Sequence, residues 1–140
     1  YINAEDYQKL EEALPRDINA FLDNSNKKKA PVRLIYNGKE MNAEAGYRGD
    51  KYWHWYFEKK SWAVRFEQEN LFENQSEIKL IVPHDRGYIE EYFSNYNARK
   101  LGLVTPKDKL VTVRVNNSSP MLYYQIEGWG REFLKNSMIA

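Results

Sequence analysis

The chain has 140 residues, a net charge of +1 and no cysteine. Its length predicts one domain, spanning 1–140, with a core of its own. The lack of cysteine excludes disulfides, thiolate metal sites and cysteine nucleophiles. The near-neutral charge argues against nucleic-acid binding, and no apolar run approaches the roughly 20 residues of a membrane span. Because the chain starts at Tyr1 rather than Met, we expect a processed or shortened chain.

The amino-terminal part predicts helix followed by loop. Asn3 can cap a first helix, which Pro15 ends. The apolar stripe of this helix contains Tyr7, Leu10 and Leu14. Residues 16–23 are interpreted as a short second helix, and 24–31 as a polar, basic loop. Its Lys27–Lys29 run is interpreted as a solvated linker rather than a ligand patch.

Alternating patterns then predict strands. Asn37-Gly38 is a strong hairpin signal between 32–36 and 41–48. Further strands are expected at 61–66, 76–82, 109–115 and 121–126. Within 61–66, Trp62, Val64 and Phe66 should face the core, and Ala63 and Arg65 should share the opposite face.

Two more helices are predicted among these strands. The longer spans 85–102, with Asp85 and His84 at its cap, Ile89, Phe93 and Tyr96 at helical spacing, and Gly102 at its end. The other begins within 131–139. Strands joined by short turns, with one long helix between them, predict an α+β fold: an antiparallel sheet with a packed helix.

The stretch 47–66 concentrates aromatic and basic residues. Either the rings belong to the core and the charges to its solvated edge, or the segment binds an anion. No serine lies in a nucleophile-elbow pattern, and His54 is interpreted as a packing residue. Arg65 in a strand, followed by Glu90 and Glu91 near the start of a helix, matches the arrangement by which protein kinases hold nucleotide phosphates. Such pairs are also common in proteins that bind no nucleotide.

Four stretches, taken in order, resemble the amino-terminal half of the spore coat protein H (CotH) kinase family. "RGDKYWHWYFEKKSWAVRF" (48–66) is similar to the family's R-G-N-S-[ST]-W followed by P-K-K-S-Y-R-I-K-F. "NARKLGLVTP" (97–106) is similar to its helix end, A-R-x-x-G-L. "VTVRVNNSSPMLYYQIEGWGREFL" (111–134) follows its strand, turn, strand and helix, and "NAEDYQKLEE" (3–12) resembles its lead-in helix.

The resemblance implies a kinase small lobe that binds ATP with Mg or Mn. It also implies a full-length enzyme that phosphorylates Ser or Thr of secreted, coat or cell-envelope proteins. Arg65 stands at the family's phosphate-holding strand lysine, Glu90 or Glu91 would be its helix partner, and the backbone of 125–127 would pass the adenine. The implied nucleotide-binding residues are Arg48, Lys59, Lys60, Arg65, Glu90, Glu91 and Glu127.

Several positions depart from the family pattern. Asp50-Lys51-Tyr52 replaces N-S-S, Glu58 replaces a proline, Arg65 replaces lysine, and Asn116-Asn117 replaces the N-G turn. Arginine binds phosphate through a planar fork rather than a point charge, so we expect these changes to weaken catalysis more than folding. The family's catalytic and metal-binding aspartates lie in a second lobe beyond Ala140. We therefore expect the 140 residues alone to be inactive and to need that lobe, in a kinase or a pseudokinase.

An alternative is a non-catalytic interaction module. Trp53, Trp55, Tyr56 and Trp62 would then form an aromatic platform for sugar rings or for another protein. Binding of single-stranded nucleic acid is a third interpretation, which the net charge opposes. Burial of these rings in the core would argue against the platform.

Overall fold

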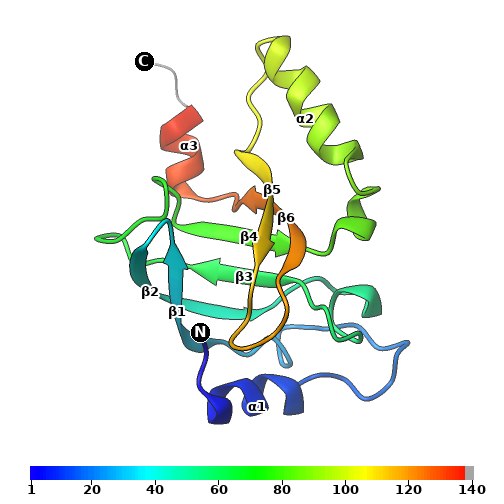
Figure 1. The fold of residues 1–140 in the computed structure, drawn as a ribbon. Coiled ribbons are helices and arrows are strands. Elements are labelled where there is room, and N and C mark those ends of the chain that lie inside the picture. Colours follow the sequence, from blue (N-terminus) through cyan, green and yellow to red (C-terminus); the bar gives the residue numbers. More distant parts are fainter. Residues whose placement is uncertain (138–140) are drawn as a thin grey trace.

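The computed structural model describes residues 1–137 and has an α+β fold, in which three helices surround a six-stranded, curled antiparallel sheet (Figure 1). The strands lie in the order β1-β2-β3-β4-β6-β5. Their bounds are β1 Ala30–Tyr36, β2 Lys39–Tyr47, β3 Trp62–Arg65, β4 Glu77–Ile81, β5 Asp108–Val113 and β6 Met121–Glu127. The helices are α1 Ala4–Glu12, α2 Glu90–Lys100 and α3 Arg131–Ser137, with short 3₁₀ turns η1 Tyr52–His54 and η2 Pro83–Arg86. The predicted fold class is confirmed.

The β1–β2 hairpin is formed as predicted. Asn37 and Gly38 have φ angles of 50° and 75°, and Tyr36 pairs with Lys39 across the turn. Two consecutive positive φ angles match the twist of the flanking strands, and asparagine and glycine adopt them at little cost. The strand predictions at 61–66, 76–82, 109–115 and 121–126 are likewise confirmed, with ends shifted by one or two residues.

One face of the sheet carries the core. Trp62, Val64 and Phe66 are buried, as their alternation predicts. The helix α1 adds Leu10 to the same cluster. The side chain of Asn3 caps α1 by accepting a hydrogen bond from Asp6 N–H at 2.8 Å. Sequence periodicity therefore predicted both the helix and the face that it buries.

The segment 16–23 is not helical, which corrects the predicted second helix. The Asp17 carboxylate accepts a hydrogen bond from Asn19 N–H at 2.9 Å, and such local bonds compete with helical ones. Leu22 instead anchors this non-helical segment to the rest of the protein. It is 1% exposed, and its N–H donates to the Asp50 carbonyl at 2.8 Å.

The long helix begins five residues later than predicted. Asp85 lies in η2, while Gly87 and Tyr88 have φ angles of 54° and 62° and interrupt the helical path. Asp85 and His84 therefore do not cap α2, whose amino-terminal cap, Ile89, makes no side-chain cap bond. The helix ends at Lys100, close to the predicted end at Gly102.

The helix α2 is attached to the end of the sheet by polar contacts. Asn95 Nδ2 donates to Asp108 Oδ2 at 3.0 Å and to the Tyr124 hydroxyl at 3.1 Å. Arg99 Nη1 lies 2.7 Å from Asp108 Oδ1. The predicted apolar stripe, Ile89, Phe93 and Tyr96, is exposed, and α2 projects away from the sheet in Figure 1. The helix thus leaves most of the second sheet face uncovered.

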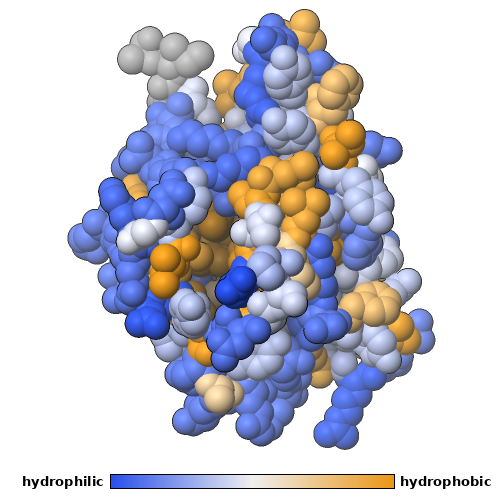
Figure 2. Space-filling view, viewed as in Figure 1, coloured by the Kyte–Doolittle hydropathy of each residue, from blue (hydrophilic) through white to orange (hydrophobic). Residues whose placement is uncertain are grey.

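The curl of the sheet brings the edge strands β1 and β5 to the two sides of an apolar hollow of about 370 Å³ (Figure 2). Its floor includes Ile78 and Leu80. At one end, Asn116 exchanges hydrogen bonds with the backbone of Ile2 at 2.8 and 2.9 Å. These bonds tie the amino terminus to the turn after β5.

The last predicted helix begins at Arg131, and its residues 138 and 139 lie outside the described part of the chain. None of the helices in residues 1–137 combines the length and the apolarity needed to cross a bilayer.

Candidate functional site

The second sheet face carries charged residues in a fixed register. Arg65 in β3 lies between Glu44 in β2 and Glu77 in β4, and Ala63 lies between Gly46 and Lys79. Directly paired residues in neighbouring strands point to the same face. Arg65 and Lys79 therefore project from the face opposite Trp62, as the alternation in 61–66 predicts for Arg65.

This face forms the floor of a cleft of about 700 Å³, here called the basic cleft. Eight cationic side chains line it: Lys27, Lys28, Lys29, Arg48, Lys51, Arg65, Lys79 and Arg86. Only four acidic side chains do so: Glu44, Asp50, Glu77 and Asp85. Although the whole chain is near neutral, positive charge is concentrated in this one concavity, which focuses the electric field there.

One wall of the basic cleft is the loop 21–29, and Gly46 allows its close approach. A Cβ at Gly46 would overlap the Lys28 carbonyl oxygen. Lys27 Nζ lies 2.7 Å from Asp50 Oδ1, which joins the loop to the segment after β2. The basic loop interpreted as a solvated linker is therefore part of the cleft wall.

Arg65 is held by a neighbouring strand rather than by a helix. Its Nε donates to Glu77 Oε2 at 2.6 Å, and Lys79 Nζ lies 4.0 Å from the other oxygen of Glu77. Glu90 and Glu91, the predicted helix partners of Arg65, do not contact it. Glu91 pairs instead with Arg86, at 3.1 Å. The predicted pairing fails because β4 places Glu77 directly beside Arg65, while α2 begins late and is attached to Asp108 and Tyr124 at the end of the sheet.

Arg48 lacks a partner for part of its guanidinium group. Its Nη1 is buried and forms no hydrogen bond to any group within residues 1–137. Burial, and then the charge of Arg86, lowers the pKa of Arg48. Burial and then Arg48 lower the pKa of Lys79. Three positive charges thus lie close together in the cleft. Arg86 and Lys79 have acidic partners but Arg48 has no ion pair within the described residues, so an anion at Arg48 would relieve the repulsion.

A buried hydrogen-bonded network supports this end of the cleft. His54 Nδ1 lies 3.0 Å from Ser61 Oγ, and His54 Nε2 lies 3.3 Å from Asp85 Oδ1. Asp85 also accepts a hydrogen bond from Trp53 Nε1 at 2.6 Å. Ser61 is fully buried and its Oγ accepts from Val82 N–H, so this serine is not available as a nucleophile. The network is structural, in line with the packing role predicted for His54.

Gly49 completes the same network. Its φ angle is 90°, and a Cβ there would overlap the ring of His54. Only glycine meets both requirements. The Arg48-Gly49 pair, noted for its family resemblance, therefore has a local physical reason: the glycine admits the His54 ring, and the arginine beside it reaches into the cleft.

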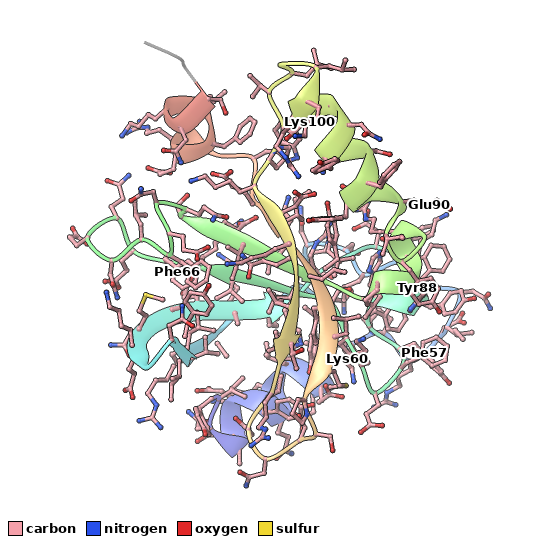
Figure 3. All side chains as sticks on the ribbon, turned by 45° about the horizontal axis from the view of Figure 1, so that its top comes forward. Phe57, Lys60, Phe66, Tyr88, Glu90 and Lys100 are labelled. Carbon is pink, nitrogen blue, oxygen red and sulfur yellow. The ribbon has the colours of Figure 1, made fainter. Side chains whose placement is uncertain are left out.

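Of the seven implied nucleotide-binding residues, only Arg48 and Arg65 line the basic cleft; Glu90 and Glu91 do not, and neither do Lys59, Lys60 and Glu127. Lys60 is 8% exposed and lies 3.3 Å from Glu11 of α1, on the core side. Lys59 lies over the Tyr123 ring. Glu127 is buried, and its Oε2 accepts a hydrogen bond from Lys107 N–H at 3.2 Å. Figure 3 shows Lys60 well separated from Glu90, which is at the start of α2.

The four-ring aromatic platform is not formed. Trp55 and Trp62 are 1% and 6% exposed and belong to the core, as predicted for Trp62. Trp53 lines the basic cleft, and Lys51 Nζ lies 4.9 Å from its ring centre. Tyr56 is exposed and does not line the cleft. The aromatic residues of 47–66 therefore divide between core, cleft and surface.

Sequence reasoning missed four parts of the cleft: Phe21, the Lys27–Lys29 run, Lys79 and Arg86. For Lys79 a usable signal exists, because strand alternation in 76–82 places it opposite the buried Ile78 and Leu80. Phe21 and the lysine run gave no such signal, since only the folded path of the loop brings them to the sheet. Within residues 1–137, no group of three or more acidic, histidine or cysteine side chains has metal-binding geometry.

The fold and the site together define an α+β protein whose open sheet face carries a basic cleft. Neither a protein-family model nor a curated protein matches the chain.

Proposed function

We propose that the basic cleft binds the phosphate groups of ATP, and that the chain is the nucleotide-binding small lobe of a CotH-like atypical protein kinase. The observation that carries the proposal is the buried Nη1 of Arg48, which has no hydrogen-bond acceptor in residues 1–137 and lies in a concavity lined by seven other cationic residues. A phosphate oxygen would supply the missing acceptor and the missing negative charge.

Arg48 and Arg65 have different roles in this proposal. Arg65 is extended across the sheet by Glu77, so its remaining guanidinium nitrogens are oriented before a ligand arrives. Arg48 provides the desolvated charge, which interacts more strongly with an anion than an exposed one does. Lys79 adds a third positive charge on the same face. A bound Mg or Mn ion would neutralise further phosphate charge.

In the full-length kinase, a second lobe would complete the cleft and supply the catalytic and metal-binding aspartates. The enzyme would then transfer phosphate from ATP to Ser or Thr of secreted, coat or envelope proteins. With only one wall of the site present, the 140 residues should bind MgATP weakly, with a Kd of about 1 mM, or about 4 kcal/mol. They should not transfer phosphate alone.

A ¹H–¹⁵N NMR titration with MgATP tests the proposal. The indole N–H of Trp53 is the reporter, because this ring lines the cleft. In wild type this signal should shift, and Arg48→Ala or Arg65→Ala should weaken binding by about 1.5–3 kcal/mol, as expected for a lost charge-assisted contact. Arg65→Lys should retain binding.

Two control variants separate the site from general charge loss. Arg114 is exposed on the segment after β5, outside the cleft, so Arg114→Ala should bind MgATP like wild type. Lys60→Ala should do the same, although Lys60 matches the family pattern, because Lys60 contacts Glu11 instead. Equal affinity of Arg48→Ala, Arg65→Ala and wild type would refute the assignment of the site.

If no nucleotide shifts the Trp53 signal, the interaction-module proposal replaces the kinase one. Its surface would be the exposed cluster of Tyr52, Tyr56 and Phe57, in which Tyr56 and Phe57 have ring centres 5.7 Å apart. Titration of oligosaccharides against tryptophan fluorescence would test it directly.

A further inference from the structure

We infer that the base of the bound nucleotide stacks on Phe21, at the rim of the basic cleft. The inference rests on the proposed nucleotide function and names the base-binding residue. Phe21 lines the cleft and is 62% exposed, so its ring is accessible beside the lysines of the loop. An aromatic ring next to phosphate-binding cations is the combination that binds nucleotides without a base-specific hydrogen bond.

Phe21 is held in place by its neighbour. Leu22 is buried, and its N–H donates to Asp50 O, which fixes the backbone at this point. Farther along the loop, Asn26 Nδ2 donates to the Ala13 carbonyl at 2.7 Å. The Lys28 carbonyl fits closely over Gly46. Because the loop is anchored at these points, the backbone that carries Phe21 is positioned before ligand binds, which lowers the cost of ordering the loop on binding.

The ring of Phe21 is also available. Within the described chain, no aromatic ring or cation stacks on it. Lys51 lies over Trp53, and Tyr47, the third large aromatic ring of the cleft, is buried against Trp62. The Trp53 indole N–H is in addition committed to Asp85. The Phe21 ring thus has a face that is open for stacking. A purine base would cover more of this face than a pyrimidine base would.

The backbone of 125–127, expected to pass the adenine, is not available for that role. The strand β6 is paired on both sides, with β4 and β5, so its backbone groups already have partners. The next two donors are also used, since Glu127 N–H bonds to Lys107 O and Gly128 N–H to Glu77 O, both at 2.8 Å. No residue of β6 lines the basic cleft. The base therefore needs a different surface, and Phe21 offers one inside the basic cleft.

Comparison of MgATP with magnesium tripolyphosphate tests the inference, because the second ligand keeps the phosphates and lacks the base. Wild type should bind MgATP at least fivefold more tightly than tripolyphosphate, as stacking on one aromatic ring predicts. Phe21→Ala should remove that difference by weakening MgATP alone. Phe21→Trp should retain it. Phe57→Ala is the matched control, because Phe57 is 49% exposed and outside the cleft.

The outcomes separate the inference from the proposed function. If Phe21→Ala binds MgATP like wild type while Arg48→Ala does not, the phosphate site stands and the base site is wrong. Equal binding of MgATP and tripolyphosphate by wild type also overturns the base site. If wild type binds neither ligand, the proposed function fails and the inference fails with it. The ¹H–¹⁵N spectrum of each variant shows whether it is folded.

Discussion

At the scale of single residues, two glycines determine the shape of the basic cleft. Gly46 admits the Lys28 carbonyl and so brings the lysine-rich loop against β2. Gly49 admits the His54 ring and has a φ angle that other residues rarely adopt. Neither position stabilises the protein through contacts of its own. Both act because they have no side chain, which leaves space for the Lys28 carbonyl and for the His54 ring. They thereby influence where the lysine-rich loop and Arg48 lie in the cleft.

The buried His54 predicts a pH dependence of stability. Its pKa is lowered from 6.5, chiefly by burial, and Arg48, Arg86 and His84 lower it further while Asp85 opposes them. The unfolded imidazole therefore takes up a proton near pH 6.5 that the folded one resists. The stabilisation is complete above pH 6.5 and is lost as the pH falls below it.

Urea unfolding of wild type and His54→Gln at pH 8 and pH 5.5 measures this effect. Wild type should lose more unfolding free energy on acidification than the variant, because glutamine does not titrate. Carboxylates that do not contact His54 contribute about equally to both proteins and cancel in the comparison; Asp85, which contacts His54, belongs to the measured effect. The same loss in both proteins would show that His54 is not the responsible group.

At the scale of elements, α2 illustrates a helix joined to the sheet by one polar cluster. The side chain of Asp108 is fully buried: its Oδ2 accepts hydrogen bonds from Asn95 and the Tyr124 hydroxyl, and its Oδ1 forms an ion pair with Arg99. The hydrogen bond from the Tyr124 hydroxyl is 2.7 Å, and burial, with Asp108, raises the pKa of that hydroxyl. The apolar side chains of α2 take no part in this attachment.

Substitutions on the two sides of α2 should therefore differ in effect. Asp108→Ala leaves the Asn95 amide and the Tyr124 hydroxyl without their acceptor and Arg99 without its counter-charge, and should cost about 2–5 kcal/mol of unfolding free energy. Phe93→Ser, at a side chain 60% exposed, should change it by less than about 0.5 kcal/mol. Chemical denaturation of both variants checks this. A large destabilisation by Phe93→Ser would mean that the outer face of α2 is covered.

At the scale of the whole molecule, the two edge strands of the sheet, β1 and β5, are joined through the amino terminus. Tyr1 pairs with Arg33 of β1, where Arg33 N–H donates to Tyr1 O at 2.8 Å. The next residue, Ile2, is bonded to Asn116 after β5. A segment of two residues thus bridges the edge strands on one side of the apolar hollow.

Asn116→Ala should weaken this bridge. It removes two hydrogen bonds between residues far apart in the chain, and it places alanine at a φ angle of 51°, which asparagine tolerates better. We expect a loss of about 1–3 kcal/mol of unfolding free energy. Asn116→Gly, which relieves the backbone strain but lacks the amide, separates the two contributions. No loss in either variant would show that the bridge does not stabilise the sheet.

The sequence by itself determined the elements and their faces, because these depend on near neighbours. Strand alternation placed Trp62 and Arg65 on opposite sides, Asn37-Gly38 specified the hairpin, and Asn3 specified the start of α1. Where a prediction failed, a local pattern had been extended too far. The helix expected from Asp85 is interrupted by the left-handed pair Gly87 and Tyr88.

Only the tertiary structure decided which charges meet. Glu77, not Glu90 or Glu91, pairs with Arg65, because β4 lies beside β3 while α2 is attached to Asp108 and Tyr124 at the end of the sheet. Likewise, Lys60 pairs with Glu11 on the core side instead of entering the cleft. The cleft itself depends on the path of the loop 21–29, whose residues carry no periodic signal. Pairing across the sheet and the course of a loop are long-range properties, and residue spacing does not encode them.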